Sequence, residues 1–79
     1  MKNVLVIGGA GYVGTHLVES LIEKNYKVTV YDLFLYGNFF QENKNLSLIN
    51  GDIRNLENLR KVIKNKFDCI IHLACISND

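Results

Sequence analysis

The sequence predicts an α/β fold in which a parallel sheet of about four strands has helices on both faces. Short, nearly continuous apolar runs alternate with segments of helical periodicity, which is typical of buried strands covered by helices. The elements follow in the order β-α-β-β-α-β, and right-handed crossovers then give the sheet order 3-2-1-4. We therefore expect a partial doubly wound, three-layer domain. Its ligand site should lie where strands one and four meet, because the strand order reverses there.

The first half of the chain predicts a strand, a helix and a second strand. Residues 3–7 contain the apolar run VLVI and form the first strand. Residues 12–24 form a helix, and Asn25 is expected to end it because asparagine tolerates the left-handed conformation. Residues 27–31 are rich in β-branched side chains and form strand two. The apolar side chains of the helix share one face, at Val13, Leu17, Val18, Leu21 and Ile22.

The second half predicts another strand, helix and strand after a mixed loop over residues 33–45. Residues 46–50 form strand three, and a Gly-Asp turn follows them. Asn55 is placed to cap a helix over residues 56–65. Residues 67–73 include the apolar run of strand four. The inner face of the second helix is expected to hold Leu56, Leu59, Val62 and Ile63.

Composition limits the class of protein. The chain has 79 residues, at most one small domain, and its 48% hydrophobic content supports a packed core. A net charge of +1 provides no field to attract nucleic acid or an anionic membrane, and no apolar run suits a membrane span or a signal peptide. Cys69 and Cys75 lie in or near an apolar strand pattern and are expected to be buried. We expect both to be reduced, because a straight strand would hold them about 20 Å apart, too far for a disulfide. We therefore expect a cytoplasmic protein without a metal site.

Three evenly spaced glycines, Gly8, Gly11 and Gly14, follow the first strand and lead into the first helix. The glycine motif can also be read from Gly9, as Gly9-x-Gly11-x-x-Gly14, and both readings share Gly11 and Gly14. This layout brings a phosphate to a helix N-terminus, where backbone N–H groups lack internal partners and the helix dipole is positive. Glycine suits positions where the backbone must touch the ligand. The alternative is a tight turn that binds nothing.

Asp32 lies at the end of strand two, 18 residues after Gly14. This offset is close to that of a carboxylate that accepts hydrogen bonds from the ribose hydroxyls of adenosine. The carboxylate would also repel a 2′-phosphate, and no lysine or arginine occurs between Asp32 and Lys44 to attract one. The pattern therefore favours NAD over NADP. The alternative is a solvated loop aspartate.

Further polar and aromatic residues follow strands two, three and four. The carboxylate of Asp52 is placed to accept from the adenine amino group, with the backbone of Ile53 beside it; a turn residue that binds no ligand is an equal alternative. His72 is interpreted as a core or edge residue and not as a general base. The loop aromatics form a flap over adenine, part of the core or a partner surface; they are Phe34, Tyr36, Phe39 and Phe40.

Four motifs together resemble the extended short-chain dehydrogenase/reductases, the NAD-dependent epimerase/dehydratase family of nucleotide-sugar enzymes. They are GGAGYVG at residues 8–14, Tyr31-Asp32, GDIR at residues 51–54 and HLAC at residues 72–75. The resemblance covers nearly the whole chain but only the start of such an enzyme. It implies a Rossmann-type fold. Ile7 departs from the family, which usually has threonine there.

The resemblance also implies how the residues would meet NAD. The backbone at Tyr12 and Val13 would contact the pyrophosphate, and Asp32 would contact the adenosine ribose. Asp52 with Ile53 would contact the adenine. Leu73 and Ala74 would lie against the cofactor where the strand order reverses.

The family's catalytic pair, Tyr-x-x-x-Lys, is absent, because no tyrosine of this chain has a lysine four residues later. We therefore expect no catalytic residue here, and interpret residues 1–79 as the N-terminal segment of a dinucleotide-binding domain whose substrate domain is absent. The parent enzyme would transfer a hydride at a carbon of a nucleotide sugar, and any homodimer would form through parts not present here. The alternative is a stand-alone, non-catalytic module for NAD binding, NAD sensing or protein interaction.

Overall fold

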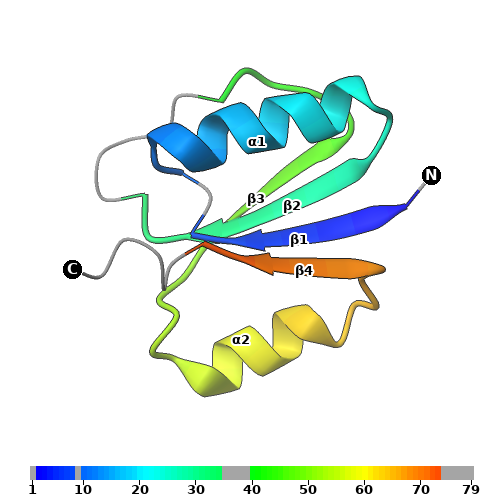
Figure 1. Ribbon diagram of the computed structural model, residues 1–79. Helices are drawn as coiled ribbons and strands as arrows, with labels where there is room; N and C mark the ends of the chain where they lie inside the picture. The colour runs from blue at the N-terminus through cyan, green and yellow to red at the C-terminus, as the bar shows by residue number, and fades with distance from the viewer. Residues whose placement is uncertain (1, 9, 35–39, 74–79) are drawn as a thin grey trace.

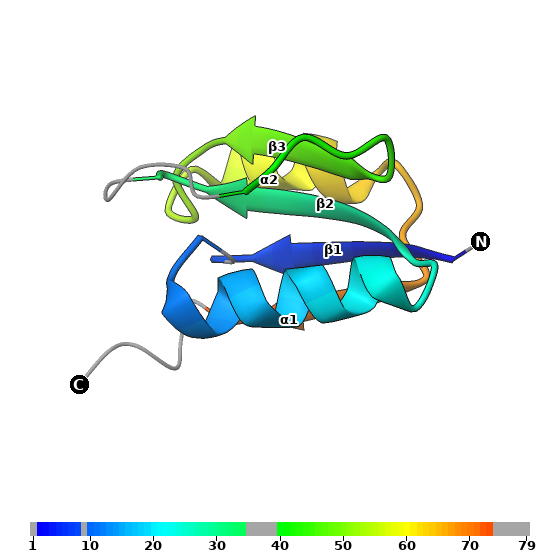
Figure 2. The same ribbon diagram turned by 90° about the horizontal axis from the view of Figure 1, so that it is seen from above.

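The computed structural model describes residues 2–8, 10–34 and 40–73. Its four strands form one parallel sheet in the order β3-β2-β1-β4 (Figure 1), which confirms the predicted order. Helix α1 covers one face of the sheet and helix α2 covers the other, as Figure 2 shows from above. In chain order the elements are β1 (Asn3–Ile7), α1 (Tyr12–Glu23), β2 (Lys27–Asp32), β3 (Leu46–Asn50), α2 (Leu56–Ile63) and β4 (Cys69–His72).

The sheet separates two apolar clusters, one under each helix. Successive side chains of a strand point to opposite faces, so β1 contributes alternate residues to each cluster. This explains why all four residues of the VLVI run are buried. The cluster under α1 is formed by Val4, Val6, Val18, Val28 and Val30, and the cluster under α2 by Leu5, Ile7, Tyr31 and Val62.

The strand predictions are confirmed within one residue for β1, β2 and β3, whereas each helix is shorter than predicted. Helix α1 ends one residue early, and Asn25 follows it with φ of 69°, the left-handed conformation expected of it. Helix α2 ends at Ile63, two residues early. The Asn55 side chain accepts a hydrogen bond from the backbone N–H of Asn58, so the predicted cap is present.

Three predicted core positions are wrong. Leu56 is 60% exposed, and Ile63 is also exposed. Val62 points at the sheet, and one residue turns a helix by about 100°, so Ile63 is directed away from the sheet; Leu56, two turns before Ile63, shares its side. Val13 is 70% exposed because the next residue, Gly14, lies on the buried face of α1, and one residue turns the helix by about 100°.

Among the residues that the structure describes, strand β4 is an edge of the sheet and pairs with β1 alone. Cys69 is therefore exposed as a free thiol, and the prediction that it is buried is wrong. Cys75 lies outside the described residues. His72 is exposed on this edge strand, in agreement with the interpretation as an edge residue. Within the described ranges, neither helix is long and apolar enough to cross a membrane.

Candidate functional site

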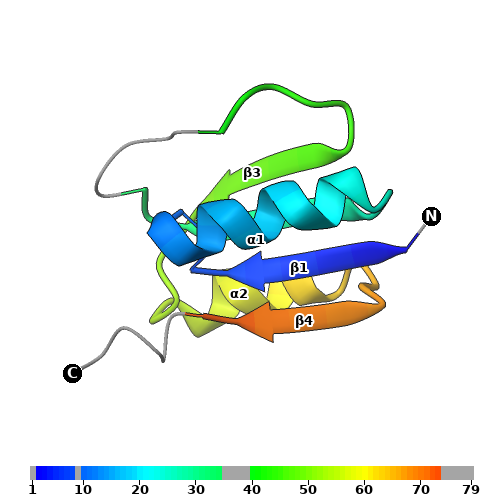
Figure 3. The ribbon, with the colours of Figure 1, turned by 45° about the horizontal axis from the view of Figure 1, so that its top comes forward.

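The glycine turn lies at the carboxyl edge of the sheet, directly after β1. Figure 3 shows the arrowheads of β1, β3 and β4 pointing to the side where α1 begins. Gly8 has φ of 81°, which L side chains rarely adopt, and its N–H donates to the carbonyl of Tyr31 at 2.8 Å. The first glycine is therefore required by the turn itself, whether or not a ligand binds.

Gly11 differs, because the fold of the chain does not require a glycine at this position. Its φ of −76° and ψ of 178° suit any residue, and a Cβ placed there would meet nothing within 4 Å. The space above its backbone is open at the point where α1 begins. Such open space fits a glycine that allows close approach of a ligand.

Gly14 has a third role. It is buried in α1 one turn before Val18, on the helix face that packs against the sheet. Its contribution is therefore close packing of helix on sheet, and its side of the helix does not face solvent. The three glycines of the motif thus serve a left-handed turn, an open backbone surface and a packed helix face, respectively.

The N-terminus of α1 has no capping side chain and no acidic residue in its first turn. The side chains of Tyr12 and Val13 are 82% and 70% exposed, so they point away from the core around this end. Helix α2 contrasts with it, because Asn55 caps its N-terminus and Glu57 lies in its first turn. The positive end of α1 is therefore the one left for an external anion.

Asp32 holds the glycine turn with its side chain. Its Oδ2 accepts from the Ala10 N–H at 3.0 Å, and its Oδ1 accepts from the Phe34 N–H at 2.8 Å. The carboxylate is half-buried, so it is not merely a solvated loop residue. Each oxygen has a second lone pair, which leaves it able to accept from a ribose hydroxyl.

The carboxylate of Asp52 is engaged by Arg54. The guanidinium lies 2.7 Å from Asp52 Oδ2, and the Arg54 backbone N–H donates to Oδ1 at 2.8 Å. The side-chain hydrogen bonds from Arg54, followed by the backbone one, hold the pKa of Asp52 below its ordinary value. The turn role considered from the sequence is therefore present. Arg54 reaches Oδ2 through both Nε and a terminal nitrogen, and because its side chain is 84% exposed, solvent screens the pair.

The last two residues of β2 join the segments of this edge. The carbonyl of Tyr31 accepts from Gly8 N–H, and the carbonyl of Asp32 accepts from Gly51 N–H at 3.0 Å. The Tyr31 hydroxyl donates to the carbonyl of Asp52 at 3.0 Å. The glycine turn and the turn after β3 are thus both bonded to the same two residues.

Leu73 lies at the point where the strand order reverses, and its N–H donates to the carbonyl of Ile7 at 2.9 Å. It therefore lies next to the end of β1, as the sequence predicts. Ala74 and Gly9 lie outside the described residues. The sequence analysis noted Tyr31 only as part of a family motif and gave its hydroxyl no role. A tyrosine within a buried strand is itself a signal, because its hydroxyl needs a partner.

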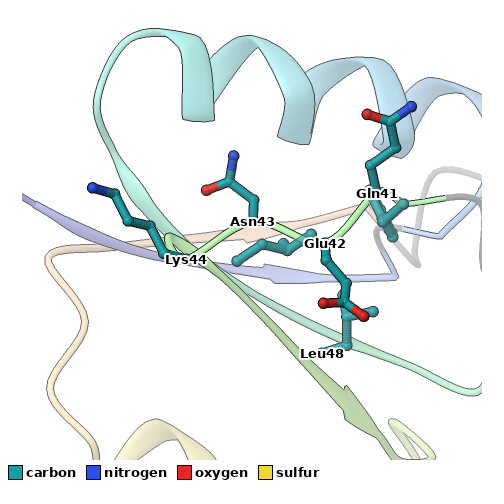
Figure 4. A pocket seen from close by; sticks show the side chains of 7 residues that line it. Gln41, Glu42, Asn43, Lys44 and Leu48 are labelled. Carbon is teal, nitrogen blue, oxygen red and sulfur yellow. The ribbon is translucent and has the colours of Figure 1, made fainter.

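A hollow of roughly 470 Å³ lies away from this edge, between residues 40–44 and β3 (Figure 4). Of the residues considered for the site from the sequence, it is lined by Phe40, one of the loop aromatics, and by none of the residues expected to meet NAD. Phe34 and Phe40 pack against the cluster under α1, which supports the core interpretation for these two aromatics; Tyr36 and Phe39 lie outside the described residues. Among the described residues, no group of three histidine, cysteine or acidic side chains could hold a metal ion.

Residues 4–79 match the model of the NAD dependent epimerase/dehydratase family. The chain belongs to this family. It is 37% identical over 75 residues to a putative UDP-glucose 4-epimerase of Methanocaldococcus jannaschii, covering 95% of this chain and 25% of that protein. It is 35% identical over 82 residues to the UDP-glucose 4-epimerase of Neisseria meningitidis, covering 94% and 24%. The resemblance noted in the sequence is confirmed.

Solved structures of related enzymes have the same fold. The enzyme WbmH of Bordetella bronchiseptica, in complex with NAD+, superimposes with a TM-score of 0.82 at 29% identity, covering 91% of this chain and 25% of that one. A dTDP-glucose 4,6-dehydratase of Bacillus anthracis, in complex with NAD, gives 0.79 at 32% identity and covers 91% and 26%. The Rossmann-type fold is confirmed. The chain spans about a quarter of the length of the family members that it matches.

Proposed function

We propose that residues 1–79 are the N-terminal NAD-binding segment of a longer epimerase or dehydratase that acts on a nucleotide sugar. The observation that carries this proposal is the open backbone at Gly11, at an uncapped helix N-terminus beside the Asp32 carboxylate. Two findings support it: the chain belongs to this family, and it spans about a quarter of the length of the relative that it matches. The stand-alone module is not favoured, because the matched relatives named above are enzymes.

Different residues of the carboxyl edge would bind different parts of NAD. The turn at Gly8 and Gly11, with the first backbone N–H groups of α1 at Tyr12, Val13 and Gly14, would hold the pyrophosphate. The pyrophosphate carries two negative charges, and the uncapped helix end gives it donors that no side chain of the first turn already occupies. Gly14 contributes through its backbone and the close packing of α1.

The adenosine half would lie across β2 and the turn after β3. Asp32 would accept from the ribose hydroxyls with the lone pairs that Ala10 and Phe34 leave. Asp52 would accept from the adenine amino group in place of a bond from the solvent-exposed Arg54 side chain, and the backbone of Ile53 would lie beside the ring. Leu73 and Ala74 would line the nicotinamide side.

Bound at this edge, NAD supplies a reversible acceptor for a hydride from a sugar carbon. The chain's own residues bind and orient it, and we assign no catalytic residue among them. The relatives' names point to UDP-sugars and dTDP-glucose as the substrate class of the longer enzyme. We further propose a cytoplasmic enzyme, where a thiol such as Cys69 stays reduced, with any homodimer formed through its remaining parts.

Replacing Asp32 by alanine is expected to weaken NAD binding by about 1.5–3 kcal/mol, the scale of hydrogen bonds to a charged group. Isothermal titration calorimetry of the wild-type chain and the variant measures this loss. Asp68→Ala is the matched control, because Asp68 also accepts a backbone N–H, that of Asn3 at 2.7 Å, but at the amino edge of the sheet. Unchanged affinity in Asp32→Ala, or an equal loss in Asp68→Ala, would show that Asp32 does not contact the cofactor.

A further inference from the structure

Tyr31 carries a hydroxyl in a place where phenylalanine would fill the same space. Tyr31 is fully buried in the cluster under α2. In the sheet it is paired with Ile7 of β1 on one side and with Ile49 of β3 on the other. A hydroxyl taken out of water destabilises the fold unless it is hydrogen-bonded. The contribution of the Tyr31 hydroxyl must therefore come from the hydrogen bonds that it makes.

Those bonds form a directed chain from α2 to the turn after β3. The side-chain amide of Asn58 donates to the Tyr31 hydroxyl at 3.0 Å, and the hydroxyl donates to the carbonyl of Asp52 at 3.0 Å. A hydroxyl has one hydrogen, so the bond from Asn58 leaves that hydrogen directed at Asp52. Asn58 is itself held, because its backbone N–H donates to the Asn55 side chain.

The same residue also holds the glycine turn. The carbonyl of Tyr31 accepts from Gly8 N–H at 2.8 Å, while its hydroxyl reaches Asp52 on the other side of β2. Gly51 packs directly on the ring, so the ring has no room to shift toward that turn. Tyr31 therefore sets the separation between the turn that receives a pyrophosphate and the turn that receives a base.

We propose that Tyr31, oriented by Asn58, is a positioning residue for adenine recognition: it holds the backbone of residues 52–53 at the distance from the glycine turn that an adenine dinucleotide spans. This inference rests on the proposed NAD-binding function. Tyr31 touches no part of the cofactor in this scheme and acts through Asp52 and Ile53. Its loss should weaken the recognition of the adenine edge and leave pyrophosphate binding in place.

The test compares two ligands in the 79-residue chain. NAD carries an amino group on its base, whereas nicotinamide hypoxanthine dinucleotide carries an oxo group there and reverses the donor–acceptor pattern of that edge. We expect the wild type to bind NAD more tightly. In Tyr31→Phe the Kd for NAD should rise about 3- to 10-fold, the range of one hydrogen bond, while the Kd for the hypoxanthine analogue stays within about twofold. Asn58→Ala should give the same pattern, with a higher Kd for NAD and a Kd for the hypoxanthine analogue that stays within about twofold.

Tyr26→Phe is the matched control, because it removes a phenol hydroxyl from the opposite edge of the sheet, after α1, and should leave both Kd values unchanged. An equal loss for both ligands in Tyr31→Phe would show a general loss of structure and overturn the inference, as would unchanged NAD binding. If the wild type binds NAD but Tyr31→Phe binds it equally well, only this inference fails. If the wild type binds neither dinucleotide, the proposed function fails with it.

Discussion

Replacing Gly11 by valine is expected to remove NAD binding while the chain stays folded. The backbone there has ordinary dihedral angles, and a Cβ added to residue 11 would have no atom within 4 Å beyond its neighbours in the chain, so we expect the fold to accept a valine. Valine is a poorer N-cap than glycine, and we expect this to lower the free energy of unfolding by about 1 kcal/mol. The added side chain would instead occupy the space that the pyrophosphate needs, and the affinity loss should exceed about 2 kcal/mol, roughly thirtyfold.

Chemical denaturation and calorimetric titration of the same preparation separate the two effects. Glu23→Val is a suitable control, because Glu23 is exposed at the other end of α1, so this variant places valine in the helix away from the site. If Gly11→Val bound NAD as the wild type does, the helix N-terminus would not be the pyrophosphate site.

Replacing Gly51 by alanine should have the opposite effect and unfold much of the population. A Cβ at Gly51 would overlap the ring of Tyr31, which is fully buried and bonded at its hydroxyl to Asp52. The backbone of Gly51 is not left-handed, so the overlap with the ring is the source of strain. Inserting a methyl group into such a core commonly lowers the free energy of unfolding by about 1–3 kcal/mol, and we expect about 3 kcal/mol because the ring is fully buried and its hydroxyl is hydrogen-bonded.

Urea denaturation of the single and double variants tests this account. Adding Tyr31→Leu to Gly51→Ala shortens the side chain that the new methyl group meets, so the two changes should be strongly non-additive. Additive losses of stability would place the strain somewhere other than the contact between residue 51 and the ring.

Local patterns predicted the sheet because each strand carries its signal within its own residues. The VLVI run of β1 and the β-branched residues of β2 need no distant partner to be recognised, and crossover handedness then orders the strands. The positions of Gly8, Gly11 and Asp32 at one edge follow directly from that order. The left-handed Asn25 and the Asn55 cap are also local features.

Contacts between residues far apart in the sequence were not predictable in this way. Tyr31 reaches Asp52 and Asn58 across more than twenty residues, and no local pattern states which buried hydroxyl finds which carbonyl. The distinct roles of Gly11 and Gly14 likewise depend on three-dimensional packing, because both look alike in the motif. The exposure of Leu56 and Ile63 depends on the exact rotation of α2 on the sheet.

Calorimetric titration of NAD and NADP into the wild-type chain, side by side, tests the central claim most directly. The Asp32 carboxylate at the glycine turn should accept from the 2′-hydroxyl of NAD and repel the 2′-phosphate of NADP. We predict that NAD binds and that NADP binds at least about tenfold more weakly, a difference of about 1.4 kcal/mol. Equal affinities, or no heat of binding from NAD, would contradict the assignment of this edge as an NAD site.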